Sequence, residues 1–472
     1  MINFEDLESI AQDFGLDFHP VEFLFVDYKE LCSLAAYSGF PNRYAHWRWG
    51  EQFEYLYKLH VYGLSHIYEM VLNTTPSIAY LDKANSDALQ KMVIMHVFGH
   101  SHFFKNNLWC SKVNPLMIEA LKNHEKRINN YIEKYGIDEV EHFITLCLSI
   151  EDLIDPNIFL KLNQQIKEEE EDVLKIQVDK KYMDSYINPH EYIEQQKEKM
   201  KAKKKEKKFE FTQDVLLFLA KNAPIDDWKQ DIIAMVREES KYFLSLIKTK
   251  IMNEGFATYV HTKLAPKYLN DSDLVEFADH CSRILSSSIF NPYKLGLMLF
   301  QDIELRWNKG RTGSDWNLCI DIEMKKNWDK KWNKGKEKIF EVVKLFDDVN
   351  FVDEFFTEDM CKEHKLFTYD YDKRDEQYKI SSRDFDNIKQ KFLFLLSNHG
   401  LPIIDLVDDN YNNTKELFLK HRHENIPLHE NYMNYTLKYI YEIWTRPVNL
   451  ETCDENKNTI IARYNGKEFE RK

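Results

Sequence analysis

The chain has 472 residues, a formal net charge of −14 and 43% hydrophobic residues. This acidic balance argues against nucleic acid as a partner, because binding to a phosphate backbone requires a basic surface. No run approaches the roughly 20 apolar residues that cross a bilayer, so we expect no membrane span.

Glycine and proline are scarce, with 13 and 12 residues respectively, which favours a mainly helical fold. The length favours at least two domains. We expect the first to be a large helical domain over residues 1–345. Its predicted helices cover 4–14, 21–37, 46–62, 65–72, 87–104, 115–135, 140–153, 211–222, 227–248, 250–264, 272–287 and 293–307, with a short extended piece at 77–81.

A charged insert over residues 167–208 interrupts this domain. It contains an acidic run at 168–172 and a basic run at 203–208. Two interpretations are open: a solvated excursion or pair of exposed helices, partly disordered, or a docking site for an acidic partner.

Short strands alternate with helices from residue 346 onward, which predicts a smaller α+β domain over 346–472. A hairpin is expected at 365–370 and 377–380. The other expected elements are helices at 382–397 and 429–444 and strands at 401–407, 416–421, 448–452 and 459–464.

The seven cysteines are scattered along the chain, and no two of them form a Cys-x-x-Cys pair. The N-terminal residues lack the basic start and apolar run of a signal peptide. Both features predict a cytoplasmic protein with reduced thiols.

Two apolar helices carry the residues that suggest a metal site. His96 and His100 are four residues apart, and Glu254 and His261 are seven apart, so each pair projects from one helix face. Buried imidazoles and carboxylates must be paired or bound to metal. We therefore expect the helices to face each other across a divalent ion, with zinc expected first and iron or manganese as alternatives. The predicted ligands are His96, His100 and Glu254, with His261 as a fourth ligand or an acid–base group.

This pattern departs from the His-Glu-x-x-His motif of zinc hydrolases at its second position, which is Val97 here. The glutamate at that position normally activates water. A hydrolase would need another base, and Glu238, Glu239 and His102 are the candidates. The structural alternatives are a core ion pair for Glu254 and a helix-surface location for the other two carboxylates.

The chain contains an ordered series of motifs: HWRWGEQF at 46–53, YGLSHIYE at 62–69, HVFGH at 96–100, VREE at 236–239, NEGFATY at 253–259, NPYKLG at 291–296, LFLKHR at 417–422 and WTRPVNLET at 444–452. In this order the motifs resemble the stage V sporulation protein R (SpoVR) family, and the resemblance covers nearly the whole chain. The resemblance implies a cytoplasmic bacterial protein linked to endospore formation and to the peptidoglycan cortex. The Asn-Glu-Gly-x-Ala helix is also similar to the third-ligand helix of gluzincin metallopeptidases.

Two hypotheses for function follow. The first is a metal-dependent hydrolase acting on peptides or peptidoglycan precursors, with a metallopeptidase-like site. The second is a regulatory or scaffolding protein without catalytic activity, in which the site is degenerate or structural and partners bind the charged insert or the C-terminal domain. Val97 favours the second hypothesis.

Overall fold

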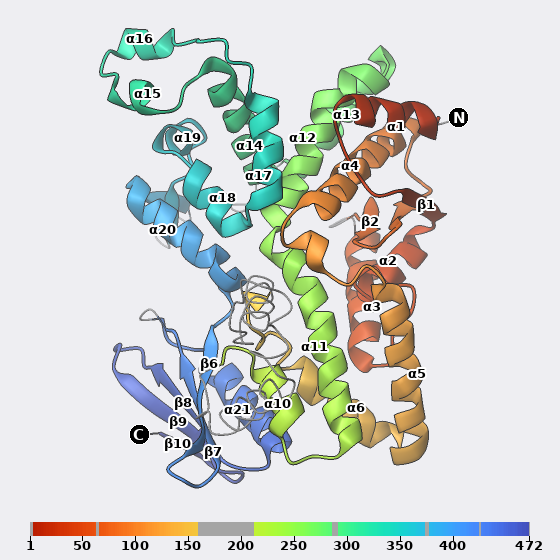
Figure 1. The fold of residues 1–472 in the computed structure, drawn as a ribbon, viewed down its shortest axis with the longest axis vertical. Helices are drawn as coiled ribbons and strands as arrows, with labels where there is room; N and C mark the ends of the chain where they lie inside the picture. Colours follow the sequence, from red (N-terminus) through yellow and green to blue (C-terminus); the bar gives the residue numbers. More distant parts are fainter. Residues whose placement is uncertain are drawn as a thin grey trace, which may run out of the picture. The chain divides into compact units, whose positions relative to one another are not determined.

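The computed structural model describes residues 3–62, 66–158, 212–285, 291–372, 377–423 and 426–471 (Figure 1). The charged insert at 167–208 lies outside the described residues. The described part confirms the mainly helical class and the α+β character of the C-terminal part. None of the helices described there is long and apolar enough to cross a membrane.

The chain divides into two compact units, each built from two stretches of sequence. The first comprises Met1–Ile137 and Lys241–Gly400, and the second comprises Asp138–Ser240 and Leu401–Lys472. This division differs from the boundary expected after residue 345. Helix α18 (Asp348–Phe355) packs against α12 (Lys250–Tyr268) and α14 (Pro292–Lys309), so it belongs to the core of the first unit.

The first unit contains a three-stranded sheet in which β3 (Ser77–Asp82) is central. β1 (Val21–Val26) runs parallel to β3, with Val21 opposite Ser77. β2 (Glu69–Leu72) runs antiparallel to β3, with Glu69 opposite Leu81.

Both outer strands correct our expectation of helix at 21–37 and 65–72. The run Val-Glu-Phe-Leu-Phe-Val at 21–26 is rich in β-branched and aromatic residues, and short apolar runs of this kind do not distinguish strand from helix. Helix α2 (Tyr28–Ala36) begins only after Asp27, whose side chain accepts the Glu30 backbone N–H.

Helix α4 (Asp87–Asn106) packs against β2 and β3 on one side and against α12 on another. Ser86 caps its N-terminus by accepting the Leu89 backbone N–H. Almost every residue of α4 from Met92 onward is buried, including its three histidines. The amphipathic pattern of a surface helix is therefore absent, and its polar side chains must find partners inside the protein.

The start of α12 is fixed by a distant carboxylate. Asp348 is buried, and its two oxygens accept the backbone N–H groups of Ile251 and Met252 at 2.8 and 2.9 Å. Two of the donors that a helix N-terminus leaves unpaired are thereby satisfied. Helix α14 begins differently, with Asn291 accepting the Lys294 backbone N–H and Pro292 in the first turn.

Glycines allow these helices to approach closely. A Cβ on Gly99 of α4 would lie 2.8 Å from the Cα of Ala257 in α12, and a Cβ on Gly255 of α12 would lie 2.4 Å from the Cα of Gly296 in α14. Any larger residue would force the backbones apart. The sequence therefore places its smallest residues where α12 crosses its two neighbours.

Buried side chains of α4, α12, α14 and α18 form one hydrophobic core together with side chains of several other elements. The first unit has further elements besides those already named. They are α1 (Phe4–Asp13), α3 (Trp47–Val61), α5 (Met117–Tyr135), α13 (Leu274–Ile284), α15 (Ser314–Leu318), α16 (Ile322–Lys326), α17 (Gly335–Leu345), α19 (Glu358–Glu363), α20 (Phe385–Leu396) and the hairpin of β4 (Thr368–Asp372) and β5 (Gln377–Ser382).

The second unit is built on a five-stranded sheet with the order β10-β9-β8-β7-β6. β7 and β8 are parallel and are joined through α21 (Glu430–Trp444), which packs on β8 and β9; the other pairs are antiparallel. The predicted strands and helix of this region are confirmed. The elements are α6 (Ile137–Leu148), α10 (Val215–Asn222), α11 (Asp227–Lys248), β6 (Ile404–Tyr411), β7 (Glu416–His421), β8 (Val448–Cys453), β9 (Thr459–Tyr464) and β10 (Phe469–Arg471). Helix α11 belongs to this unit only as far as Ser240.

Candidate metal centre

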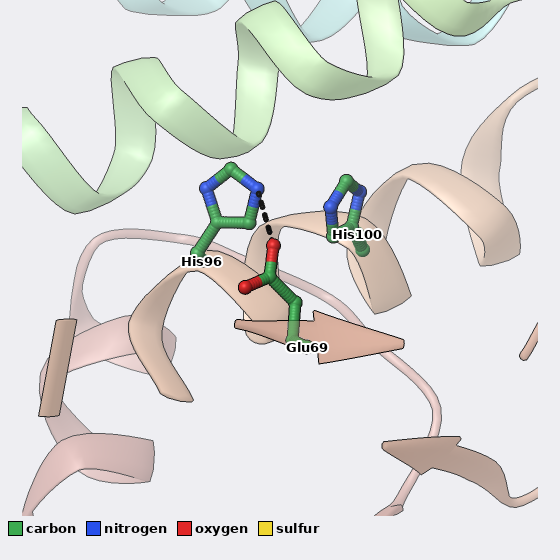
Figure 2. A group of neighbouring side chains, drawn as sticks. All are labelled: Glu69, His96 and His100. Atoms are coloured by element: carbon green, nitrogen blue, oxygen red, sulfur yellow. Dashed lines mark ion pairs between the residues drawn. The ribbon is translucent and has the colours of Figure 1, made fainter. Parts of the chain in front are cut away.

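Three elements of the first unit bring polar side chains to one point. Helix α4 supplies His96 and His100, α12 supplies Glu254, and β2 supplies Glu69. Figure 2 shows Glu69 extending from its strand toward the two imidazoles on α4. The residues come from positions up to 185 apart in the sequence, so tertiary packing alone assembles the group.

One carboxylate oxygen faces both imidazoles. Glu254 Oε2 lies 3.6 Å from His96 Nε2 and 3.6 Å from His100 Nε2. Glu69 Oε1 lies 3.8 Å from His96 Nε2, and together with the two histidines it forms a group whose ligand atoms lie within 4.8 Å of one another. Two ligands bound to zinc at 2.0–2.1 Å in tetrahedral geometry are separated by about 3.4 Å. The spacing is thus that of a slightly open metal site.

The second nitrogen of each imidazole is held by a partner. His100 Nδ1 lies 2.9 Å from Asn253 Oδ1, and His96 Nδ1 lies 2.9 Å from His261 Nδ1. The Asn253 oxygen only accepts, so His100 donates through Nδ1 and its Nε2 lone pair faces Glu254. Hydrogen bonds of this kind orient metal-binding histidines in proteins.

The pKa directions suit ligand roles for this group. Burial lowers the pKa of His100 to about 4, so this imidazole is neutral at physiological pH, as metal binding requires. Burial also lowers the pKa of His261 well below its ordinary value. For Glu254, burial raises the pKa, but the neighbouring imidazoles of His96 and His100 outweigh it and lower the pKa below its ordinary value.

Glu69 is shifted in the opposite direction. Burial raises its pKa, His96 lowers it, and the negative charge of Glu254 adds to the increase. The two carboxylates of the site therefore differ in how readily they take up a proton. Such divergence between neighbouring acids is typical of sites where one carboxylate stays ionised and the other exchanges protons.

Two atoms at the centre fit a bound cation. His96 Nε2 and Glu254 Oε2 are buried and have no hydrogen-bond partner within the part of the chain that the structure describes. A buried polar atom without a partner is costly, and a buried carboxylate without compensating charge is more so. A divalent ion between these atoms would satisfy both and balance the charge of the acid.

A pocket of about 330 Å³ opens onto this group. The residues lining it include Glu69, His96, His261, His280 and Tyr293. The ring of Tyr293 stacks on His96 with 6.3 Å between centroids. The charge of Glu254, together with burial and the charge of Glu69, raises the pKa of Tyr293 well above its ordinary value, so its hydroxyl remains a hydrogen-bond donor.

The other predicted site residues lie elsewhere or in different roles. His261 contacts the Nδ1 of His96, opposite the nitrogen that faces Glu254. His102 accepts the Asp17 backbone N–H at 2.9 Å, and its ring packs on two phenylalanines. Glu238 is exposed and Glu239 is buried in α11, within the second unit, so their predicted catalytic role stays a prediction.

Glu69 was absent from the residues that we expected in the site. The segment at 65–72 has helix-like spacing, and only its last four residues form a strand. A usable signal was present nearby, because a Thr-Pro pair separates Val71-Leu72 from the extended piece at 77–81. That pattern is typical of two adjacent strands joined by a turn.

The fold and the geometry define a helical protein with a two-histidine, two-glutamate group beside a pocket. Comparison with known proteins identifies the family of the chain. The chain belongs to the SpoVR family, since the family model described as SpoVR like protein matches residues 3–401 and that of the SpoVR-like C-terminal domain matches residues 402–455. It is also 26% identical over 495 residues to the uncharacterized protein YcgB of Escherichia coli (strain K12), covering 96% of this chain and 91% of the relative. No solved structure matches the chain.

Proposed function

We propose that this SpoVR-family protein binds one divalent metal ion, zinc being expected, through His96, His100 and Glu254, and that it is a metal-dependent hydrolase. The observation that carries the proposal is the single Glu254 oxygen at 3.6 Å from both Nε2 atoms. The lack of a hydrogen-bond partner for His96 Nε2 and for this same oxygen supports it.

The bound ion would supply a Lewis acid and lower the pKa of a water molecule to about 7. The protein's own groups prepare the site. Asn253 and His261 hold the two imidazoles by their Nδ1 atoms, which fixes the orientation of each ring. Three protein ligands leave one coordination position open, as catalytic zinc sites do. The pocket beside His96 gives a substrate access to that position.

Family membership connects this chemistry to the cell wall only through the resemblance described above. We infer on that basis that the substrate is a peptide or a peptidoglycan precursor and that the protein acts in spore cortex formation. We also propose the cytoplasm as its location, on the basis of its scattered cysteines.

Metal analysis tests the proposed site. Protein purified without an affinity tag should contain about one equivalent of zinc or another divalent ion, because the site offers one set of ligands. The Glu254→Gln and His96→Gln variants should lose the metal while remaining folded. Matched controls are Glu304→Gln, whose carboxylate pairs with Lys263 at 2.8 Å, and His142→Gln, an exposed histidine. Full metal content in Glu254→Gln would overturn the assignment.

A regulatory or scaffolding role is the second candidate, favoured by Val97, a fully buried aliphatic residue where zinc hydrolases have their base. In that case partners would bind the charged insert or the C-terminal domain. Complementation of a deletion strain separates the two roles. A hydrolase should fail with Glu254→Ala and tolerate loss of residues 167–208, and a scaffold should show the reverse.

A further inference from the structure

The site contains one carboxylate more than a three-ligand metal centre needs. Glu254 reaches both imidazoles through one oxygen at 3.6 Å, which satisfies the ligand set together with His96 and His100. Glu69 approaches only His96 among the ion pairs of the described chain, at the longer distance of 3.8 Å. The second carboxylate is therefore available for another role.

The two carboxylates also differ in what they face. Glu69 lines the pocket together with His96, whereas Glu254 is not among the described residues that line it. Glu69 comes from β2, and Figure 2 shows its carboxylate reaching toward the imidazoles, 3.8 Å from His96 Nε2. A group in this position meets a water molecule and a substrate that enter from the pocket.

We propose that Glu69 is the general base of this site and replaces, from a strand, the glutamate that zinc hydrolases carry immediately after their first histidine. Val97 occupies that position here and is fully buried. This inference rests on the proposed metal site. The substrate class is an amide or ester, because a carboxylate beside an activated water serves hydrolysis of a carbonyl compound.

The step balances without a further reagent. One O–H bond of water breaks and its proton moves to a Glu69 oxygen, while the water oxygen forms a bond to the carbonyl carbon. The same proton then passes from Glu69 to the departing nitrogen or oxygen as its bond to carbon breaks. Glu69 ends in its starting form, and water is the only reagent consumed.

A test that needs no known substrate uses acetohydroxamic acid and azide as probes of the full-length protein loaded with Co²⁺, whose visible spectrum reports ligand binding. Acetohydroxamic acid binds a metal as an anion, so a neighbouring base must accept its proton. Azide is already an anion and needs no base. The variants are Glu69→Gln, which removes the proton acceptor, and Glu69→Asp, which keeps a carboxylate.

The expected result has three parts. Glu69→Gln keeps one equivalent of metal and wild-type affinity for azide, and it loses at least about tenfold in affinity for acetohydroxamic acid, as expected for removal of one hydrogen bond to a charged group. Glu69→Asp recovers part of that affinity. If Glu69→Gln does not fold, Glu69→Asp still tests the proposal. Its shorter carboxylate should weaken the binding of acetohydroxamic acid and leave the binding of azide unchanged.

Two results would overturn the role of Glu69 as a base without refuting metal binding by the wild-type protein. Loss of metal from Glu69→Gln would make Glu69 a ligand, and unchanged hydroxamate affinity would make it a bystander. Absence of metal binding by the wild-type protein, by contrast, would refute the proposed function itself. The failure of the base and the failure of the site are thus separate outcomes.

Discussion

Replacing Gly99 with alanine tests whether the close approach of α4 and α12 creates the site. Gly99 lies between His96 and His100, and its neighbour Ala257 lies between Glu254 and His261. The added Cβ would be 2.8 Å from Ala257 Cα and 3.2 Å from Ala257 Cβ. Since ordinary contact begins at 3.4 Å, the helices must separate by at least about 0.6 Å.

The two consequences of Gly99→Ala differ in size. Overpacking of a close-packed core costs about 1–3 kcal/mol, and alanine in a helix regains about 0.5–1 kcal/mol, so the net loss of unfolding free energy should be about 0–2.5 kcal/mol. Metal sites hold their ligand distances to within about 0.2 Å. A helix separation of about 0.6 Å exceeds this tolerance. Gly99→Ala should therefore reduce zinc affinity at least about tenfold, an effect comparable to the loss of a hydrogen bond that orients a metal ligand.

Urea unfolding of the metal-free protein and competition with a zinc chelator measure the two effects separately. Gly50→Ala in α3 is the matched control, because a Cβ there would meet no atom within 4 Å. It should leave zinc affinity unchanged and raise stability by up to about 1 kcal/mol. If Gly99→Ala were destabilised yet bound zinc as tightly as the wild type, the helix spacing would not determine the site.

Three further predictions concern groups away from the centre. Asp348→Asn should lower the unfolding free energy by about 1–3 kcal/mol in urea titrations, because an amide offers one acceptor where the carboxylate accepts two backbone N–H groups. His421 is buried, and burial lowers its pKa to about 4, so on acidification the unfolded chain binds a proton at this residue before the folded protein does. The unfolding free energy should therefore fall by up to about 3 kcal/mol as the pH drops from about 6.5 to 4. The His421→Gln variant should lack this part of the pH dependence. Glu416→Gln should destabilise the second unit by about 1–3 kcal/mol, measured by thermal unfolding, since Arg463 loses one of its two charged partners in the described chain and keeps only Glu470.

The two helices that carry the site could be predicted from the sequence because their polar residues interrupt otherwise apolar segments. His96 and His100 share a face through their four-residue spacing, and both side chains are buried. The expectation that α4 and α12 meet followed from the cost of burying such groups alone. The structure places Glu254 within 3.6 Å of both histidines, so the helices do meet there.

The sequence did not identify Glu69 as a site residue, because a local sequence pattern says little about which distant strands pair. β2 has four residues, and its strand character depends on pairing with β3 rather than on its own alternation. The face on which Glu69 lies is set by the register that puts it opposite Leu81. A shift of one residue would turn the carboxylate to the other face of the sheet.

His261 shows a related limit of helical spacing. Residues seven apart share a face, but about 1.5 Å of rise per residue separates their backbones by about 10.5 Å. Spacing along one helix cannot tell which of the two side chains reaches a point set by the other helix. In the structure Glu254 faces the Nε2 atoms and His261 contacts the Nδ1 of His96.

The tight helix crossing and the unpaired polar atoms have a common explanation in a preformed cation site. An ordinary core could place larger apolar residues at Gly99 and Gly255 and dispense with a buried acid, because a well-packed apolar group is often at least as stabilising as a buried ion pair. This chain instead brings backbones into contact and leaves Glu254 Oε2 without a hydrogen bond. Rigid helices hold ligands more accurately than loops do. The stability lost by burying the acid would be recovered when a cation binds, since a ligand that binds only the folded state stabilises it by mass action.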